Sequence, residues 1–502
     1  MRRSSRIAST AYKPNYNYHV KQEVLTEPTT VHEAISGPEA NHWHVAMKEE
    51  FDSLLSNNTW SLVDLPNNKK PINCKWVFKK KHDANGDFIR HKARLVVKGF
   101  SQQYGIDYSE TFAPVVRYTS IRFLLAIAAK YNLEIRQMDA VTAFLNGDLK
   151  EEIYMCQPEQ FNDGTNRVCI LNKSLYGLKQ SSRVWNEKLN SVLINFGLQR
   201  CDADQCIYYH IHSKKMLFMA VYVDDVVIFT NDKELDQRLT NELCKNFQMK
   251  NLGDITSILG IRVTRDRKNG TIAIDQEQYI NEILHRFVMD DCNPVSTPMD
   301  LNQKISSKMC PINDEKKQQM KNIPYMETIG SLLFAAQITR PDISYPVNFL
   351  SRYSQNPGKC HWSAVKRIFR FLKGTSHKKL TYTEVPNDII GYCDADWACD
   401  LDERKSTSGY VFTMQGAAIS WCSKKQPTVA LSTTEAEYMA MTSAIQELIW
   451  LKKLSHELIP LSNNQIILYC DNKSTIQYVT NNSYSNRTKH IEIKSNFIRE
   501  HN

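Results

Sequence analysis

The sequence predicts a multidomain protein that combines α/β and α+β architecture. Its 502 residues are enough for about three to four domains, and 42% of them are apolar, so buried cores can form. Strand-like apolar runs alternate with segments of helical spacing between residues 39 and 265, and again from Leu380 onward. The stretch between them, residues 266–380, is mostly helical in pattern and basic. These observations predict two mixed domains joined by a helical region.

The first 38 residues are predicted to be a basic tail or linker. MRRSSRIAST is rich in Arg and Ser and lacks acids, as a transit peptide would be. Pro14, Asn15 and Asn17 then follow in place of an amphipathic helix, so a flexible linker is favoured. From Glu39 to Leu55 the apolar residues take helical spacing.

A basic hairpin is predicted next. WVFKKKHDANGDFIRHKARLVV contains two strand-like runs, and Asn85-Gly86 supplies the turn between them. Basic groups that bind phosphates and aromatic groups that stack on bases fit a polynucleotide groove. A solvated edge hairpin with apolar residues on its other face explains the pattern equally well. The crowded basic residues are Lys69, Lys70, Lys75, Lys79, Lys80, Lys81, Arg90, Lys92, Arg94 and Lys98, interleaved with Trp76, Phe78, Phe88 and Phe100.

Two adjacent aspartates, Asp224 and Asp225, lie inside the apolar run LFMAVYVDDVVIFT. Carboxylates in such a run are costly to bury unless something neutralises them. The flanking residues are β-branched or aromatic, which indicates a strand or a tight hairpin. Hard oxygen ligands on a rigid turn suit Mg²⁺. Two such ions, about 3.5–4 Å apart, can clamp the attacking and the leaving oxygen of a phosphoryl transfer.

Such a site needs a further carboxylate, and the sequence predicts Asp139. It follows an apolar run and precedes the turn at Asn146-Gly147, so a strand ending there could lie beside the hairpin. All three carboxylates would then lie on one edge. An Asp-Asp pair is more often a solvated turn. Asp290-Asp291, which follows QYINEILHRFVM and precedes Pro294, is interpreted as a helix end followed by a loop and is assigned no chemistry. The apolar flanks distinguish Asp224-Asp225 from that second pair.

The segment from residue 381 carries a second acidic set. IIGYCDADWA predicts a strand that ends at Asp394, STTEAEY begins a long helix at Glu435, and QIILYCDNKS predicts a strand that ends at Asp471. Asp396 and Glu437 lie two residues beyond the first and second of these. Three convergent carboxylates would hold two divalent metals for phosphodiester hydrolysis. Each also has a purely structural interpretation, such as a helix N-cap for Asp471-Asn472 and a helix-dipole partner for Glu435.

Cysteine usage, hydropathy and charge restrict the class of protein. The 13 cysteines show no C-x-x-C pair and no Cys/His zinc spacing, which argues for a reducing compartment without disulfides or structural zinc. No apolar run approaches the 18–20 residues or so of a membrane span, so we expect a protein that is neither secreted nor in a membrane. The net charge of +9 favours a polyanionic partner.

An ordered series of motifs from about Glu39 to Arg499 resembles a known family. On these motifs the chain is similar to the reverse transcriptase and ribonuclease H portion of a copia-type LTR retrotransposon Pol polyprotein. The motifs include KARLVVKGFSQQYGIDYSETFAPVV, QMDAVTAFLNGDLKEEIYMCQPEQF, NKSLYGLKQSSRVW, YVDD, LGDITSILGI, TRPDISYPV, STSGYVF, ISWCSKKQ and STTEAEY.

The resemblance implies a right-hand polymerase with fingers, palm and thumb, followed by a ribonuclease H-like α/β domain. On this basis residues 1–38 are the tail and residues 39–265 are the fingers and palm. Residues 266–380 are a helical thumb or connection. Residues 381–502 are the ribonuclease H-like domain, which is expected to be incomplete at its C-terminus.

The same resemblance implies an RNA-directed DNA polymerase that transfers nucleotides from dNTPs to a primer 3′-hydroxyl. Asp139, Asp224 and Asp225 would hold two Mg²⁺ ions, with Mn²⁺ able to substitute. One ion would lower the pKa of the 3′-hydroxyl and the other would stabilise the pyrophosphate leaving group. The other site residues that the resemblance implies are Phe144 as the aromatic gate beneath the incoming sugar, Gln180, Lys79, Lys92 and Arg94 at the nucleotide, Leu259-Gly260 at the primer grip, and Asp394, Glu435 and Asp471 as ribonuclease H metal ligands.

The implied partners are an RNA template, a DNA or tRNA primer, an RNA–DNA hybrid and dNTPs. The implied location is the cytoplasm, including a virus-like particle, or the nucleus. The chain departs from the family at Ser182, where Pro is usual, and at Asn496, where His is usual. It also stops at Asn502, before the last ribonuclease H carboxylate of the family. We therefore expect impaired hydrolysis.

Two alternatives stay open at this point. An inactive or nucleic-acid-binding remnant of a Pol polyprotein would carry the same motifs. A host nuclease of the ribonuclease H class would explain the second acidic set, but it leaves YVDD and LYGLKQ unexplained.

Overall fold

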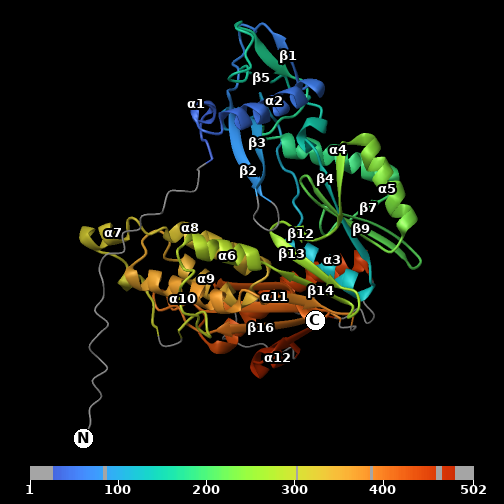
Figure 1. The fold of residues 1–502 in the computed structure, drawn as a ribbon. Coiled ribbons are helices and arrows are strands. Elements are labelled where there is room, and N and C mark those ends of the chain that lie inside the picture. Colours follow the sequence, from blue (N-terminus) through green and yellow to red (C-terminus); the bar gives the residue numbers. More distant parts are fainter. Residues whose placement is uncertain (1–26, 83–87, 301–302, 385–387, 460–465, 481–502) are drawn as a thin grey trace. The chain divides into compact units, whose positions relative to one another are not determined.

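The computed structural model describes residues 27–82, 88–300, 303–384, 388–459 and 466–480. The chain has a mixed α/β architecture, as predicted, and falls into two compact units (Figure 1). Unit 1 comprises Met1–Ala113 and Phe144–Lys188, and unit 2 comprises Pro114–Ala143 and Leu189–Asn502. In the described part of the chain, every helix is too short or too polar to cross a bilayer. The boundaries predicted at residues 265 and 380 stay predictions.

Unit 1 contains a three-stranded sheet in the order β1–β6–β5 and the separate hairpin β2–β3. Its core gathers large side chains such as Trp43, Trp76 and Phe78 between helix α2 and the strands. The helices and strands that lie in or begin in this unit are α1 (Val31–Ser36), α2 (Ala40–Ser56), β1 (Trp60–Val63), β2 (Cys74–His82), β3 (Phe88–Val97), η1 (Gly99–Ser101), β5 (Tyr154–Met155), β6 (Val168–Leu171) and α4 (Ser181–Phe196).

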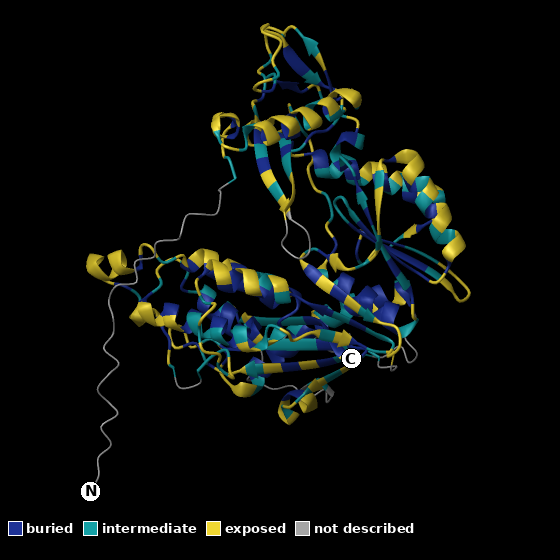
Figure 2. Cartoon of the chain, in the orientation of Figure 1, coloured by how far each residue is buried: buried dark blue, intermediate teal, exposed yellow. Residues whose placement is uncertain are grey.

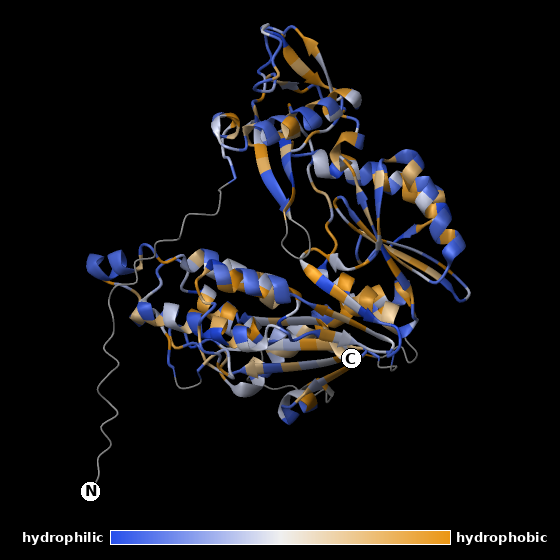
Figure 3. Cartoon of the chain, in the orientation of Figure 1, coloured by the Kyte–Doolittle hydropathy of each residue, from blue (hydrophilic) through white to orange (hydrophobic). Residues whose placement is uncertain are grey.

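The predicted basic hairpin is present as β2 and β3. Trp76 and Phe78 on β2 pair with Leu95 and Ala93 on β3, and all four are buried. Because side chains alternate across a strand, Lys75, Lys79, Lys92 and Arg94 occupy the opposite face. The hydrophilic end of the hairpin is visible in Figure 3. The turn predicted at Asn85-Gly86 lies outside the described residues.

Two glycines of unit 1 hold the end of β3 against the LYGLK loop. A Cβ at Gly99 would lie 2.0 Å from the carbonyl oxygen of Gly177. Gly177 has a φ of +96°, and a Cβ there would lie 2.1 Å from the carbonyl oxygen of Val97. Contacts this short are with backbone atoms, which cannot rotate away.

We expect Gly177→Ala to destabilise unit 1 by about 3 kcal/mol or more, because it adds a backbone clash to an unfavourable φ. Gly164 is a matched control, since it has a φ of +77° but nothing within 4 Å of the position that an added methyl group would take. Gly164→Ala should cost only about 1–2 kcal/mol. Urea denaturation followed by tryptophan fluorescence measures both. Equal losses would show that the close approach at Gly177 is not tight.

The described residues of unit 2 form three sheets. The largest has six strands in the order β11–β4–β10–β9–β8–β7, and its central strands are buried (Figure 2). The others are β12–β13–β14–β15 and β18–β17–β16–β19. The strands are β4 (Glu134–Ala140), β7 (Gln199–Arg200), β8 (Ile207–His212), β9 (Lys215–Tyr222), β10 (Asp225–Thr230), β11 (Met249–Asp254), β12 (Ser257–Ile258), β13 (Ile261–Asp266), β14 (Thr271–Asp275), β15 (Leu380–Tyr382), β16 (Ile390–Asp396), β17 (Thr407–Met414), β18 (Ala417–Lys425) and β19 (Ile467–Cys470).

Helices connect and cover these sheets. The described part of the stretch predicted to be helical contains the five helices α6 to α10, and β14 lies at its start. The helical segments are α3 (Tyr118–Lys130), η2 (Ala143–Asn146), α5 (Lys233–Asn246), α6 (Glu277–Arg286), η3 (Ser307–Met309), α7 (Asp314–Met320), α8 (Tyr325–Ile338), η4 (Pro341–Ile343), α9 (Ser344–Ser351), α10 (Lys359–Thr375), α11 (Thr433–Leu458) and α12 (Lys473–Thr480).

Helix α3 is buried on every side along Ser120–Ala129. It packs against β10, β14, β15 and β18, which belong to three different sheets. One hydrophobic cluster therefore runs from Phe229 in the six-stranded sheet through α3 to Ile419 in the C-terminal sheet. A helix that is apolar all round is expected to be enclosed in this way.

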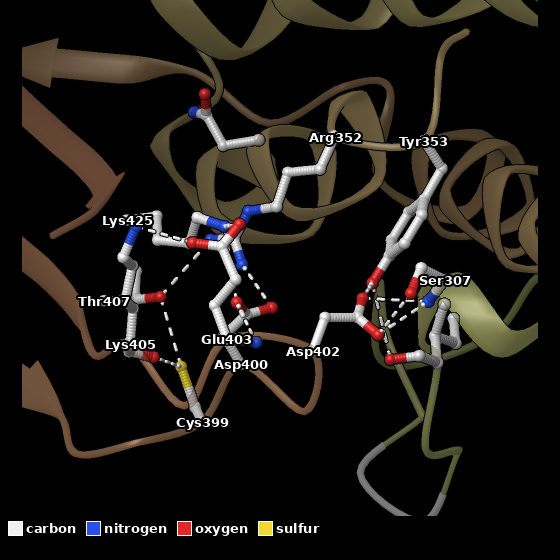
Figure 4. A network of polar contacts seen from close by, with 12 residues as sticks. Ser307, Arg352, Tyr353, Cys399, Asp400, Asp402, Glu403, Lys405, Thr407 and Lys425 are labelled. Carbon is white, nitrogen blue, oxygen red and sulfur yellow. Dashed lines mark hydrogen bonds and ion pairs between the residues drawn. The ribbon is translucent and has the colours of Figure 1, made fainter. Parts of the chain in front are cut away.

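A polar network joins the helical region of unit 2 to the C-terminal sheet (Figure 4). Asp402 accepts hydrogen bonds from the backbone N–H of Ser307, at 2.8 and 2.9 Å, and from the Tyr353 hydroxyl, at 3.3 Å. The buried Asp400 pairs with Arg352 and Lys425, at 3.5 and 3.3 Å. Asp400 and Asp402 lie in the loop between β16 and β17, so these contacts hold that loop against the helical region.

Candidate active sites

The first candidate site is built on two paired strands of unit 2. Strands β4 and β10 are antiparallel, and their register places Asp139 directly opposite Asp225. Residues that are directly opposite in an antiparallel pair have side chains on the same face. The structure therefore brings together the two carboxylates that the sequence predicted to meet.

The third carboxylate lies in the turn between β9 and β10. Tyr222 pairs with Asp225, so Val223 and Asp224 form a two-residue hairpin connection. The φ of Val223 is +55°, an uncommon value for a β-branched residue. The backbone N–H of Ala140 donates to the carbonyl oxygen of Asp224 at 2.9 Å, which ties the turn to the end of β4. Strained backbone that is held by its surroundings is typical of functional sites.

The sequence explains why this edge carries the charges. The residues that follow Asp225 on β10, Val226–Phe229, are all buried and anchor the strand in the sheet. Asp139 near the end of β4, Asp224 in the turn and Asp225 at the start of β10 are only partly buried. The Nε2 of Gln137 donates to Oδ1 of Asp225 at 3.2 Å, which orients that carboxylate. Three carboxylates at one sheet edge form a hard-oxygen donor set that fits divalent cations such as Mg²⁺.

Lys250 is a charged neighbour that the sequence argument missed. In the ladder between β11 and β4, Lys250 lies opposite Asp139, on the side away from Asp225. It is exposed. A lone lysine in QMKNLG gives no signal in the sequence, because only the strand register places it beside Asp139.

The predicted nucleotide-binding cations lie on one face of the β2–β3 hairpin in unit 1. Lys79 is opposite Lys92 in the ladder, and Arg94 lies two residues farther along on the same face. Lys79 is exposed and pairs with Glu27. Burial lowers the pKa of Lys92, and the positive charges of Arg94 and Arg90 add to this effect. This crowding of like charges favours an anionic ligand.

Tyr176 connects this basic face with Phe144. The guanidinium of Arg94 lies 4.8 Å from the centre of the Tyr176 ring. The Phe144 ring meets Tyr176 edge to face, with centroids 4.7 Å apart. Phe144 is half-buried, so part of its ring is accessible. Tyr176 lies in the LYGLKQ motif but was not predicted as a site residue.

The Gln180 side chain is buried and hydrogen-bonded within unit 1. It is 2% exposed. Its Oε1 accepts from Nε2 of Gln102 at 3.0 Å, and its own Nε2 donates to the carbonyl oxygen of Asp107 at 2.9 Å. The amide thus joins two loops of unit 1, and the predicted contact with a nucleotide would require it to leave these partners.

Leu259 and Gly260 form the two-residue turn between β12 and β13. Both have positive φ, +51° and +78°. A turn with two positive φ values matches the twist of a hairpin. The predicted primer-grip residues are therefore at the tip of a tight hairpin in unit 2.

The second candidate site lies at the C-terminal sheet. Strands β16 and β19 are parallel neighbours, so Asp394 near the end of β16 and Asp471 just after β19 reach the same edge. Both side chains are exposed. Asn472, not Asp471, caps α12, because its Oδ1 accepts from the backbone N–H of Thr475 at 2.9 Å.

Glu435 has local hydrogen-bond partners at the start of α11. Its backbone N–H donates to Oγ of Ser432 at 3.2 Å, and its Oε2 accepts from the N–H of Leu431 at 2.7 Å. This local arrangement closes the first turn of α11, as a capping box does. These contacts fit the structural interpretation of Glu435, and its role as a metal ligand stays a prediction.

Glu437, two residues further along α11, lies beside β16 and near the two aspartates. Its Oε1 accepts from the backbone N–H of Ala395 on β16 at 3.2 Å. Burial raises the pKa of Glu437 to about 7, and the negative charges of Asp394 and Asp471 contribute to the rise. Two successive Glu residues at spacing two in STTEAEY point to different sides of a helix, and the choice between them required the sheet register.

The chain is similar to known proteins along most of its length. The family described as "Reverse transcriptase (RNA-dependent DNA polymerase)" matches residues 57–301. The Pol polyprotein of transposon TNT 1-94 from Nicotiana tabacum is 47% identical over 477 residues, 94% of this chain and 36% of that protein. The Pol polyprotein of transposon RE2 from Arabidopsis thaliana is 38% identical over 97% of this chain and 33% of that protein.

A shorter relative is matched along its whole length. A protein of transposon Ty5-1 from Saccharomyces cerevisiae is 34% identical over 316 residues, 62% of this chain and 100% of that protein. The chain spans about a third of the length of the two plant polyproteins.

Proposed function

We propose that this chain, which belongs to the copia-type transposon Pol polyprotein family and carries its reverse transcriptase domain, catalyses RNA-directed DNA synthesis from dNTPs. The observation that carries the proposal is the cross-strand pair Asp139 and Asp225, with Asp224 in the turn tied to Ala140. This arrangement puts three carboxylates where hard divalent cations can be held.

Asp139, Asp224 and Asp225 would hold the metal ions of this reaction, two Mg²⁺ or Mn²⁺ ions. Bound ions would supply Lewis acidity at the primer 3′-hydroxyl and charge neutralisation at the pyrophosphate. The protein positions its carboxylates rigidly through the ladder and the Val223 turn. Gln137 holds the Asp225 carboxylate in one orientation through its hydrogen bond at 3.2 Å.

The basic face of unit 1 would bind the triphosphate of the incoming nucleotide. Lys79, Lys92 and Arg94 line one face of the hairpin, and cations in that arrangement stabilise phosphoryl oxygens. Phe144, packed on Tyr176, would lie beneath the incoming sugar and exclude a 2′-hydroxyl. Arg94 also stacks on Tyr176, so the residue proposed to bind the triphosphate and the residue proposed to lie beneath the sugar pack on the same ring.

Incorporation of labelled dTTP on an oligo(dT)-primed RNA template tests this proposal. We expect synthesis with Mg²⁺, none in excess EDTA, and recovery when Mg²⁺ is restored. Omission of the primer should abolish the signal. Folded protein that binds the primed template but incorporates nothing under any of these conditions would favour the nucleic-acid-binding remnant.

We further propose that Asp394, Glu437 and Asp471 are the metal-binding carboxylates of a ribonuclease H-like site. Glu437 replaces Glu435 in the set predicted from the sequence. The buried Glu437 carboxylate has a raised pKa beside the two aspartates, and a bound cation would relieve their mutual repulsion. The proposed substrate is the RNA strand of an RNA–DNA hybrid.

Substitution at the two glutamates separates the alternatives. Glu437→Gln should weaken Mn²⁺ binding at this site at least about tenfold, because a ligand is lost. Glu435→Gln should leave Mn²⁺ binding unchanged, since a glutamine oxygen can still accept the capping hydrogen bond. Free Mn²⁺ measured by electron paramagnetic resonance, in an Asp224→Asn, Asp225→Asn background that removes the other site, gives both affinities. Equal weakening by the two substitutions would contradict the assignment of Glu437.

A further inference from the structure

A thiol lies among the carboxylates of the C-terminal sheet. One oxygen each of Glu437 and Asp471 and the Sγ of Cys470 all lie within 4.8 Å of one another. Cys470 is the last residue of β19, so the strand delivers its thiol and the Asp471 carboxylate to the same edge. Glu437 reaches this edge from α11, above the sheet.

Glu437 has an unused ligand atom. The residue is 6% exposed. Its Oε1 accepts from Ala395, but its buried Oε2 has no hydrogen-bond partner among the described residues. A buried carboxylate oxygen without a partner is costly and requires an explanation, such as an ion that completes it.

The strand register supports Cys470 as a ligand. Cys393 on β16 lies directly opposite Cys470 in the parallel ladder. Cys393 is buried and its Sγ donates to the carbonyl oxygen of Tyr469, at 3.6 Å. The Cys393 thiol also hydrogen-bonds the Cys470 thiol, so the two sulfurs lie side by side at this end of the ladder. Cys470 is less buried and faces the carboxylates.

We propose that Glu437, Cys470 and Asp471 form a binding site for Zn²⁺. Carboxylates alone favour Mg²⁺ or Mn²⁺, but a thiolate shifts the preference to a softer ion such as Zn²⁺. Zinc takes sulfur at about 2.3 Å and carboxylate oxygen at about 2.0–2.2 Å, and three protein ligands leave a fourth position for water. Binding converts the thiol to a zinc-bound thiolate and releases one proton to solvent.

The site differs from the structural zinc sites that the cysteine spacing excluded. Those sites are closed by four ligands, often from short motifs, whereas this one draws on α11 and β19 and has an open position. Because it uses Glu437 and Asp471, Zn²⁺ there would displace the harder ions of the proposed ribonuclease H-like site. That consequence rests on the proposed function, but Zn²⁺ binding itself does not.

The test is the zinc affinity of the full chain with its cysteines reduced, measured by competition with a chromophoric chelator. Cys470→Ser should lower the affinity of one zinc equivalent on the order of 100-fold. Asp471→Asn should also lower it, and Cys244→Ser, at an exposed cysteine on α5, should not. Cobalt substituted for zinc should show a thiolate charge-transfer band that only Cys470→Ser abolishes.

Unchanged zinc affinity and an unchanged cobalt band in folded Cys470→Ser would overturn the site. If Cys470→Ser and Cys244→Ser lowered zinc affinity equally, the bound zinc would lie elsewhere. Circular dichroism establishes the folding of each variant. Because the readout is metal binding, the site can hold even if no nucleotide incorporation is found.

Discussion

Asp139→Asn is expected to lower the rate of nucleotide addition about a thousandfold, because loss of a metal-binding carboxylate removes several kcal/mol of transition-state stabilisation. Asp139 reaches the site from β4, across the ladder from Asp225. Asparagine has nearly the same size and keeps the strand pairing. Template–primer binding should stay within about twofold, since phosphate contacts by cations dominate that affinity.

Single-turnover primer extension measures the rate, and fluorescence anisotropy of a labelled template–primer measures the affinity. Asp291→Asn is a matched control from the second Asp-Asp pair, which lies in an exposed turn after α6. Its rate should equal that of the wild type. If Asp139→Asn extends primers at the wild-type rate, Asp139 is not a ligand and the site must be assembled differently.

Arg122→Leu is expected to lower the free energy of unfolding of unit 2 by about 3–5 kcal/mol. Arg122 is 3% exposed and lies in α3. Its Nε donates to the carbonyl oxygen of Ile419 at 2.7 Å, and its Nη1 donates to those of Gln337 and Ile338 at 3.0 and 2.9 Å. Leucine would leave these carbonyls without their donor.

Arg117→Met is the matched control for this substitution. Arg117 is an exposed residue at the N-terminus of α3, and its guanidinium lies 4.7 Å from the Trp450 ring centre. Loss of one exposed cation–π contact should cost about 1 kcal/mol or less. Urea denaturation of both variants gives the comparison. A loss at Arg122 no larger than that at Arg117 would contradict its role as a joint between three segments.

Much of the first site could be predicted from the sequence because its signals are local. The apolar flanks of Asp224-Asp225 indicated a hairpin, and the run before Asp139 indicated a strand. In the basic hairpin, Trp76 and Phe78 face away from Lys79, as expected from the open alternative with apolar residues on the other face.

The sequence leaves choices open where long-range contacts decide. Glu435 and Glu437 are both plausible from the sequence, and only their contacts with Leu431 and Ala395 distinguish a capping residue from a site residue. Lys250 became visible only through its register with Asp139. Gln180 carries a polar side chain that a motif can nominate, but its burial depends on Gln102, which lies far away in the sequence.

The hydrogen bonds of Arg122 to distant carbonyl groups could not be predicted from the sequence either. Its partners Gln337 and Ile419 are 215 and 297 residues away, and backbone carbonyls leave no trace in a sequence. An arginine within the apolar helix SIRFLLAIAAK would ordinarily be placed on a wet face. The structure instead encloses α3 between three sheets, where Trp421 covers the guanidinium at 4.0 Å.

The most direct test of the polymerase assignment is primer extension on an RNA template with dNTPs and Mg²⁺. The wild-type chain and the Asp224→Asn, Asp225→Asn double variant are compared at equal template–primer occupancy. We predict extended products from the wild type and none from the double variant. Extension by both proteins would contradict the assignment of this carboxylate site, and extension by neither would contradict the polymerase function of this chain.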